Sequence, residues 1–482
     1  MPQFLLEGPT LPPPAFLAFL VPLSLQALLL HPVFPSTLSR LVRLLLTPFS
    51  LALSFATPYR YAIEPRNQAI GVNFVIGIMG AYGVMKGLEW GLAADLLPYT
   101  FVGFDPATGT TANAQDKAAT TRDDRLEARR RRRAHLAALR AKRAAEDGPI
   151  DILRATAHLL VSMRGQGYEF CGTTTAPFAL DHAAFFSRVV KEVAWAHPLL
   201  VLCSAALLEP PTSRDAALFA VLPSALVGDR APQERVHAVG EALTGLAMGT
   251  AVFAALTLGF SVATLGAFLG TLVVRRIPFV PEALCPPPWD AREYPPLFNL
   301  AERPQSVAKF WSHQWHSFFS RPFRFLAFKP TQRVVAPVLG KSAARAAGVL
   351  AVFALSAWLH EFGLASAIST LPRPSSPLSF LTKWGGSVYF LSQGVGVVLE
   401  GAFTAATGRR VRGWAGTVWT AAFVACAGGW LYSAWVTQGL VREVPPVRYW
   451  AWQRYVVPMA CLQPPPVWMN AYPTSYGLER AA

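Results

Sequence analysis

Long apolar runs, separated by short polar or proline-rich segments, dominate this chain. About 20 apolar residues span the hydrocarbon core of a bilayer, and the candidate runs are Ala15–Leu30, Leu41–Ala56, Ala69–Leu92, Val189–Leu208, Ala238–Val274, Ala346–Leu371, Trp384–Ala405 and Trp414–Val436. A further run, Ala216–Val227, is too short to cross unaided. Open β edges are not viable in lipid, so the pattern predicts an all-α polytopic transmembrane bundle of about eight spans.

The run Ala238–Val274 stands apart because of its length. It holds a single charged residue, Glu241, and is too long for one ordinary span, yet no polar turn divides it in two. Gly245 and Gly249 place two small residues on one helix face, which favours close helix packing. The topology of this run stays open at the level of sequence.

Composition agrees with a membrane protein. Of the 482 residues, 52% are hydrophobic and only 15% are charged, whereas soluble domains carry roughly 25% charged residues. We therefore expect a single membrane domain over residues 1–482, with a basic polar cytosolic loop at 105–147 and a proline-rich loop at 277–305. The N-terminus has no basic segment ahead of its first apolar run, so we expect a signal-anchor helix rather than a cleavable signal peptide.

The net charge of +15 is concentrated in one segment. Between Lys117 and Arg143, eleven lysine and arginine residues stand against three acidic residues. The stretch Arg125–Arg143 is expected to be helical but outside the membrane. Such a cluster favours the cytosolic side and attracts anionic lipid. Nucleic-acid binding would need a folded reader beside the basic patch, and none is recognised here, so we expect no nucleic-acid partner.

Cysteine usage predicts neither a zinc site nor a disulfide framework. The five cysteines, at positions 171, 203, 285, 426 and 461, are far apart, and no CxxC pair occurs. A zinc-protease HExxH motif is also absent, because Leu364 stands where the second histidine would be. We therefore expect no bound metal ion and no bound cofactor.

A histidine and a glutamate, His360 and Glu361, are the only ionisable residues in the run Ala346–Leu371. Ionisable side chains within a membrane segment are costly and mark functional sites by default. Histidine is also the side chain that best exchanges protons near neutral pH. The alternative is a structural role, in which Ser356 one turn earlier simply satisfies the ring.

A second unusual segment, Lys309–Lys329, is both aromatic and basic. If this segment is helical, His313 and His316 lie three residues apart on one face. Its tryptophans and arginines suit an amphipathic element at the membrane surface, with the tryptophans at headgroup level. These residues are Trp311, Trp315, Arg321 and Arg324. The alternative is an interfacial anchor that takes no part in chemistry.

The chain carries a series of short blocks in a fixed order. They are Lys86–Trp90 (KGLEW), Arg164–Tyr168 (RGQGY), Tyr294–Phe298 (YPPLF), Phe310–His316 (FWSHQWH), the apolar run around His360, and Phe390–Glu400 (FLSQGVGVVLE). In this order they resemble the wax synthase-like branch of the membrane-bound O-acyltransferase (MBOAT) superfamily, the branch common in fungi. The resemblance covers residues from about 70 to 440.

The resemblance implies transfer of an acyl group from acyl-CoA, a co-substrate, to the hydroxyl of a hydrophobic acceptor in the endoplasmic reticulum membrane. His360 would be the general base, and His316 would orient the thioester or stabilise the oxyanion. Glu361, about 100° around the helix from His360, would orient a partner. The expected substrate-binding residues are Trp311, Trp315, His313, Arg321, Arg324 and Glu361.

Two departures from the family pattern bear on the substrate. Ser312, His313 and Gln314 stand where the family often has Gly-Arg-Arg, and Tyr168 stands in place of tryptophan. The expected acceptor is a secondary metabolite such as a terpenoid, with an acetyl or a fatty acyl donor, and the alternative is a long-chain alcohol with a fatty acyl donor. A transporter with an intramembrane His/Glu relay and a non-catalytic scaffold are the alternatives from other classes. The sequence does not predict the oligomeric state.

Overall fold

A computed structural model describes residues 12–63, 70–104, 122–171, 181–208, 233–299, 303–369, 377–438 and 440. The main helices are α1 (Leu20–Leu28), α2 (Ser36–Arg60), α3 (Ile70–Leu92), α4 (Arg122–Glu146), α5 (Pro149–Val161), α6 (His182–Leu208), α9 (Gln233–Val274), α12 (Lys329–Ala367), α13 (Phe380–Thr407) and α14 (Gly413–Thr437). Within these ranges one isolated antiparallel bridge joins Phe101 and Tyr168, and no strand forms. The all-α prediction is confirmed.

Five segments in the described part of the chain are long and apolar enough to cross a membrane, as expected of a polytopic membrane protein. They are Ser36–Arg60, Ile70–Leu92, Leu243–Val274, Ser320–Ala367 and Phe380–Thr407. The prediction of about eight spans is not confirmed. The first expected span becomes a 3-10 turn, Pro14–Phe19, followed by the short helix α1, and the run Ala216–Val227 lies outside the described residues.

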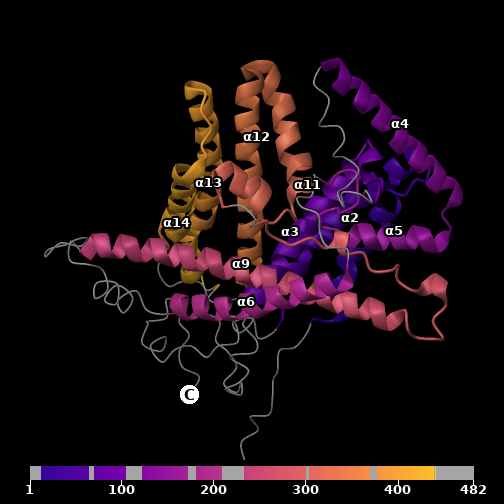
Figure 1. Ribbon diagram of the computed structural model, residues 1–482, viewed down its shortest axis with the longest axis horizontal. Coiled ribbons are helices and arrows are strands. Elements are labelled where there is room, and N and C mark those ends of the chain that lie inside the picture. The colour runs from indigo at the N-terminus through magenta and orange to yellow at the C-terminus, as the bar shows by residue number, and fades with distance from the viewer. Residues whose placement is uncertain are drawn as a thin grey trace, which may run out of the picture.

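The helices form two groups that cross each other. Helices α12, α13 and α14 stand beside one another in Figure 1, and α6 and α9 run alongside each other across their lower part. Helix α3 packs between α2 and α12, while α4 extends outward above α5 (Figure 1). The largest apolar core lies where α9, α12, α13 and α14 meet, and it includes Leu364, Tyr389, Phe390 and Trp435.

The apolar segment Ser320–Ala367 is a hairpin of two helical limbs rather than one straight helix. Gly340, with φ 78° and ψ 173°, leaves the helical backbone between the limbs, a conformation open to glycine because it has no Cβ. The limbs pack closely, since a Cβ on Gly348 would lie 2.9 Å from the Phe328 ring. The second limb holds His360, in agreement with the run expected from Ala346.

Helix α9 is continuous over 42 residues, which makes it roughly 63 Å long at 1.5 Å per residue. The run that the sequence could not divide is therefore a single helix. Gly245 lies against α14, because a Cβ there would be 2.8 Å from the backbone of Ala425 and Gly428. A Cβ on Gly249 would meet no atom within 4 Å. Of the two glycines, only Gly245 makes a close helix contact.

We expect Gly245→Val to destabilise the protein by about 1–3 kcal/mol, because the added methyl groups meet α14 backbone that cannot give way locally. Thermal unfolding of the detergent-purified protein measures the loss. Gly249→Val is the matched control on the same helix, and its effect should stay within the small propensity difference between glycine and valine. Equal losses in the two variants would contradict the contact between α9 and α14.

Candidate active site

His360 lies on α12 with its ring directed at α13 and α14. Its Nδ1 is 2.7 Å from the backbone carbonyl oxygen of Ser356, one turn earlier. A carbonyl oxygen only accepts, so Nδ1 carries the proton and Nε2 of the neutral ring is an acceptor. The ring stacks on Phe390 with centroids 4.1 Å apart, and Trp435 lies 6.1 Å away. The ring is thus held in one tautomer and one orientation, as a general base requires.

His316 follows a π-helical turn, η7 (Phe310–Gln314), at which the regular helix ends. The N–H of Trp315 donates to the carbonyl of Phe310 at 2.9 Å, five residues earlier, and the backbone of Trp315 is extended. The imidazole is enclosed by aromatic rings with centroids 5.2–6.1 Å away, those of Phe298, Phe318 and Phe319. Single π-helical turns occur frequently at functional sites.

The structure brings the two histidines within electrostatic range of each other. Burial lowers the pKa of His316 to about 3, and His360 and Arg164 add smaller contributions in the same direction. The His316 ring is therefore neutral at physiological pH. Its buried Nδ1 has no hydrogen-bond partner among the described residues. Such a group costs free energy unless a ligand supplies the missing bond.

One prediction about the segment Lys309–Lys329 was wrong. After η7 the chain breaks before α11 (Ser320–Phe323), so His313 and His316 do not share a helix face. His313 is exposed beside the Ser312 hydroxyl, whereas His316 is turned inward. The physical reason is that the π-helical turn changes the rotation per residue and the chain then becomes extended.

Trp311 and Trp315 are half-buried and pack against other side chains of the protein, and their position at headgroup level stays a prediction. Trp311 donates from Nε1 to Oε1 of Gln393 at 3.2 Å, and its ring lies 5.9 Å from that of Phe353. The Trp315 ring lies 4.9 Å from that of Phe298. The two tryptophans therefore line the same aromatic region as His316, and binding of substrate by them stays a prediction.

Gln393 of α13 is a candidate residue that sequence reasoning did not single out. Its side chain is fully buried, and its Nε2 donor has no partner in the part of the chain that the structure describes. It lies one turn from Phe390, whose ring stacks on His360. A signal was available, because Gln393 is the only amide side chain in α13.

Glu361 turns from α12 toward α13. Its Oε1 accepts hydrogen bonds from the hydroxyl of Ser387 at 2.9 Å and from the backbone N–H of the same residue at 3.0 Å. Because Glu361 directly follows His360, its side chain leaves α12 about 100° around the helix from that of His360, as expected. The Glu361 carboxylate thus links α12, which carries His360, to α13. Contact between Glu361 and a substrate stays a prediction.

Arg321 belongs to a buried ion cluster with α3. Its Nε donates to Oε1 of Glu89 at 2.8 Å, and Lys86 pairs with the other carboxylate oxygen at 3.0 Å. The hydroxyl of Tyr99 donates to the same Glu89 oxygen at 2.8 Å. The guanidinium of Arg321 is therefore engaged inside the protein, whereas Arg324 is exposed and accessible to an anionic substrate.

Glu400, the last residue of the block Phe390–Glu400, holds the segment before the histidine block. Its two oxygens accept from the backbone N–H groups of Val307 at 2.7 Å and Ala308 at 2.9 Å. The indole N–H of Trp419 donates to it as well, at 2.9 Å. These N–H groups begin α10 (Val307–Lys309), where a carboxylate is favourable. Glu400 therefore positions the start of the segment that leads to His316.

We expect Glu400→Ala to lower the turnover number severely, since a misplacement near 1 Å at the reacting groups can cost about 10²-fold in rate. The charge-assisted hydrogen bonds lost are worth about 1.5–3 kcal/mol each, so the unfolding temperature should fall too. Glu400→Gln keeps the shape and one acceptor, and it should recover part of both. Full activity in Glu400→Ala would show that the segment positions itself without this carboxylate.

Arg164 connects the RGQGY block to the histidine segment. Its Nη1 donates to the carbonyl of Pro295 at 2.8 Å, and its Nε donates to the hydroxyl of Ser317 at 3.2 Å. Burial lowers the pKa of Arg164 to about 10, which leaves the group charged at neutral pH. Because Ser317 directly follows His316, this contact joins the RGQGY block to the histidine segment.

The site contains no recognisable metal centre within the described ranges. No group of three or more His, Cys, Asp or Glu side chains there could hold a metal ion. The described cysteines at 171, 203, 285 and 426 are all free thiols, and the cysteine at 461 lies outside the described residues.

Comparison with known proteins covers the histidine segment. Residues 294–382, which include both His316 and His360, match the membrane bound O-acyl transferase family. A stretch of 145 residues is 32% identical to a protein of Arabidopsis thaliana named probable long-chain-alcohol O-fatty-acyltransferase 2. That stretch is 29% of this chain and 38% of the relative. No solved structure matches the chain. The MBOAT resemblance is confirmed over this segment, and nothing tests the fungal branch.

Proposed function

We propose that this chain is a membrane-bound O-acyltransferase that transfers an acyl group to the hydroxyl of a hydrophobic alcohol. The observation that carries the proposal is the geometry of His360. Its Nδ1 is bound to the Ser356 carbonyl, which directs the basic Nε2 away from its own helix. The histidine lies in the segment that matches O-acyltransferases, and that likeness supports the same chemistry here.

The proposed reaction needs one base and no covalent intermediate. The Nε2 of His360 accepts the hydroxyl proton while the hydroxyl oxygen attacks the carbonyl carbon of the acyl thioester. The tetrahedral oxyanion then collapses and the carbon–sulfur bond breaks. The proton passes from the imidazolium to the leaving thiolate. The products are an ester and a free thiol, and His360 returns to its neutral form.

The developing oxyanion needs hydrogen-bond donors that are already in place. Two buried nitrogens near the site lack partners among the described residues, Nδ1 of His316 and Nε2 of Gln393. We assign His316 to the oxyanion or to orientation of the thioester, and Gln393 to a second donor. Trp311 supports this arrangement, because its bond to Oε1 of Gln393 leaves only the amide nitrogen to face a substrate.

The substrates follow from chemistry and from the named relative. Acyl-CoA is the proposed donor, and we assign Arg324, which is exposed, to its phosphates. A long-chain alcohol is the acceptor best supported, because the Arabidopsis protein carries that activity in its name. A hydroxylated terpenoid, which the sequence blocks suggested, is the competing acceptor. The endoplasmic reticulum is the proposed membrane.

An ester assay on microsomes containing the full chain tests this function. Labelled palmitoyl-CoA and, separately, labelled acetyl-CoA are supplied with hexadecanol or with a panel of terpenoid alcohols, and both labelled ester and free thiol are measured. We expect palmitoyl ester with hexadecanol and one thiol released per ester. Ester with terpenoids alone would replace the acceptor. No ester and no thiol from folded protein with any pair would contradict the function and favour the transporter.

A further inference from the structure

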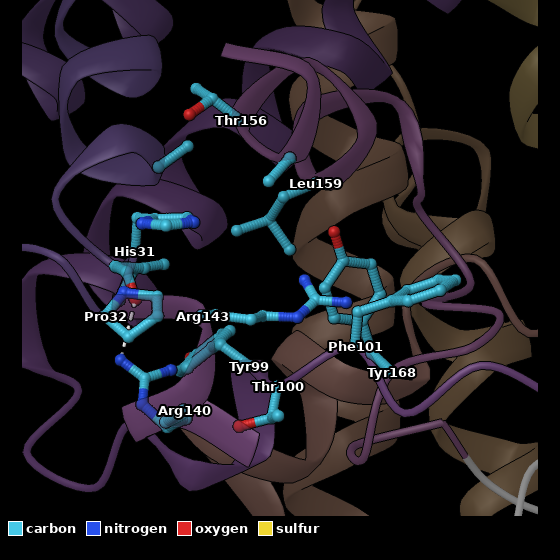
Figure 2. Close-up of a pocket in the computed structure, with 13 residues that line it drawn as sticks. His31, Pro32, Tyr99, Thr100, Phe101, Arg140, Arg143, Thr156, Leu159 and Tyr168 are labelled. Carbon is cyan, nitrogen blue, oxygen red and sulfur yellow. Dashed lines mark hydrogen bonds between the residues drawn. The ribbon is translucent and has the colours of Figure 1, made fainter. Parts of the chain in front are cut away.

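A cavity separate from the two histidines opens on the side of the protein that bears the basic helix. It has a volume of about 30 Å³ and lies between the end of α1, the 3-10 turn η3 (Leu97–Tyr99), α4 and α5. Figure 2 shows His31, Thr100, Arg140 and Arg143 around it, with Tyr168 on its far side. The space suits a small polar group, since one water occupies about 10–15 Å³ on this measure.

The two arginines of this cavity differ in what they bind. Arg140 donates to the backbone carbonyls of Leu96 at 3.1 Å and Leu30 at 3.0 Å, so it closes the wall. Arg143 extends toward the rings of Phe101 and Tyr168 (Figure 2). Its guanidinium lies 5.7 Å from the centroid of Phe101, and no hydrogen bond or ion pair joins its side chain to a described residue. The guanidinium N–H groups of Arg143 can therefore donate two parallel hydrogen bonds to the oxygens of a phosphate.

Thr100 supplies an independent sign of a missing ligand. Thr100 is one of the lining residues, only 3% of it is exposed, and its hydroxyl has no partner within the described ranges. Buried hydroxyls are normally hydrogen-bonded, because leaving one unpaired costs free energy. An oxyanion bound in the cavity is a candidate acceptor for this hydrogen bond after rotation of the Thr100 side chain.

The acidic groups around the cavity contact side chains other than Arg143. Asp147 lies 3.0 Å from Nε2 of His31, and Glu293 lies 3.5 Å from His158 on α5. Asp95 pairs with Arg133 at 3.0 Å. None of these three carboxylates is hydrogen-bonded or ion-paired to Arg143.

The exposed surface of the two lining helices bears on which oxyanion the cavity binds. Helices α1 and α5 form the cavity wall and also carry exposed apolar side chains, with Val21 61% and Leu153 63% exposed. Such a surface can cover acyl chains. We propose that the cavity binds the phosphate of an anionic phospholipid through Arg143 and Thr100, while its acyl chains lie along α1 and α5. This site is independent of the proposed acyl transfer.

Binding of short-chain lipid to the detergent-purified full chain tests this site. Dioctanoyl phosphatidic acid is the probe, and dioctanoylglycerol, inorganic phosphate and coenzyme A are titrated alongside it by calorimetry. We expect phosphatidic acid to bind at least tenfold more tightly than each of the other three. Arg143→Gln should weaken it tenfold or more, and Thr100→Val severalfold with an unchanged unfolding temperature.

The matched control is Arg129→Gln, which removes the same charge from an exposed position on the same helix and should change the affinity less than twofold. Equal weakening by Arg129→Gln and Arg143→Gln would reduce the binding to surface charge and overturn the site. Unchanged affinity in both Arg143→Gln and Thr100→Val would overturn it as well. Tighter binding of inorganic phosphate or coenzyme A than of phosphatidic acid would overturn the lipid as its ligand.

Discussion

Replacement of His360 by alanine is expected to abolish ester formation, with a loss of about 10²–10⁴-fold in turnover, the range that a positioned general base contributes. The loss should fall on turnover more than on the apparent affinity for acyl-CoA, because the base acts in the transition state. Ester formed per minute in microsomes, at saturating donor and acceptor, measures the effect.

Two variants separate loss of the base from loss of packing at the same position. His360→Asn keeps an N–H that can donate to the Ser356 carbonyl but has no basic nitrogen, so it should be as inactive as His360→Ala. His135→Ala, at an exposed position on α4, should keep full activity. Substantial ester formation by folded His360→Asn would remove His360 as the base while leaving the enzyme class intact.

Replacement of Glu89 by glutamine is expected to lower the free energy of unfolding by about 3–5 kcal/mol, the typical cost of removing one partner from a buried ion pair. Glu89 is fully buried and Lys86 is 3% exposed, so the variant leaves Lys86 and Arg321 as uncompensated buried cations. Chemical unfolding of the purified protein in detergent measures the loss. A loss of this size would show that the cluster of Lys86, Glu89 and Arg321 contributes to stability.

An exposed pair on α4 provides the control for this prediction. Glu127 pairs with Arg131, and the two side chains are 61% and 79% exposed. Glu127→Gln should change stability by no more than about 1 kcal/mol, since exposed ion pairs contribute little. Adding Lys86→Met to Glu89→Gln should recover part of the loss. A Glu89→Gln protein as stable as the wild type would refute the buried cluster as a source of stability.

The sequence alone determined the features that depend on local pattern. In lipid, an apolar run that is not part of a closed barrel satisfies its backbone hydrogen bonds only as a helix. The expected runs Ala69–Leu92 and Val189–Leu208 end at the same residues as α3 and α6. The isolated pair His360–Glu361 and the ordered blocks pointed to the same segment that later matched an O-acyltransferase family. These signals need no knowledge of distant contacts.

Only the tertiary structure decided which polar groups meet. Arg321 and Glu89 are 232 residues apart, and Glu400 reaches Val307 across 93 residues, so no periodicity in the chain could pair them. The unpartnered amide of Gln393 and the inward turn of His316 likewise follow from how helices pack and where a π-helical turn interrupts regular rotation. Burial in an apolar bundle makes every unpaired polar group costly. Buried polar groups therefore pair with residues that are distant in the sequence, and neither composition nor local spacing predicts these pairs.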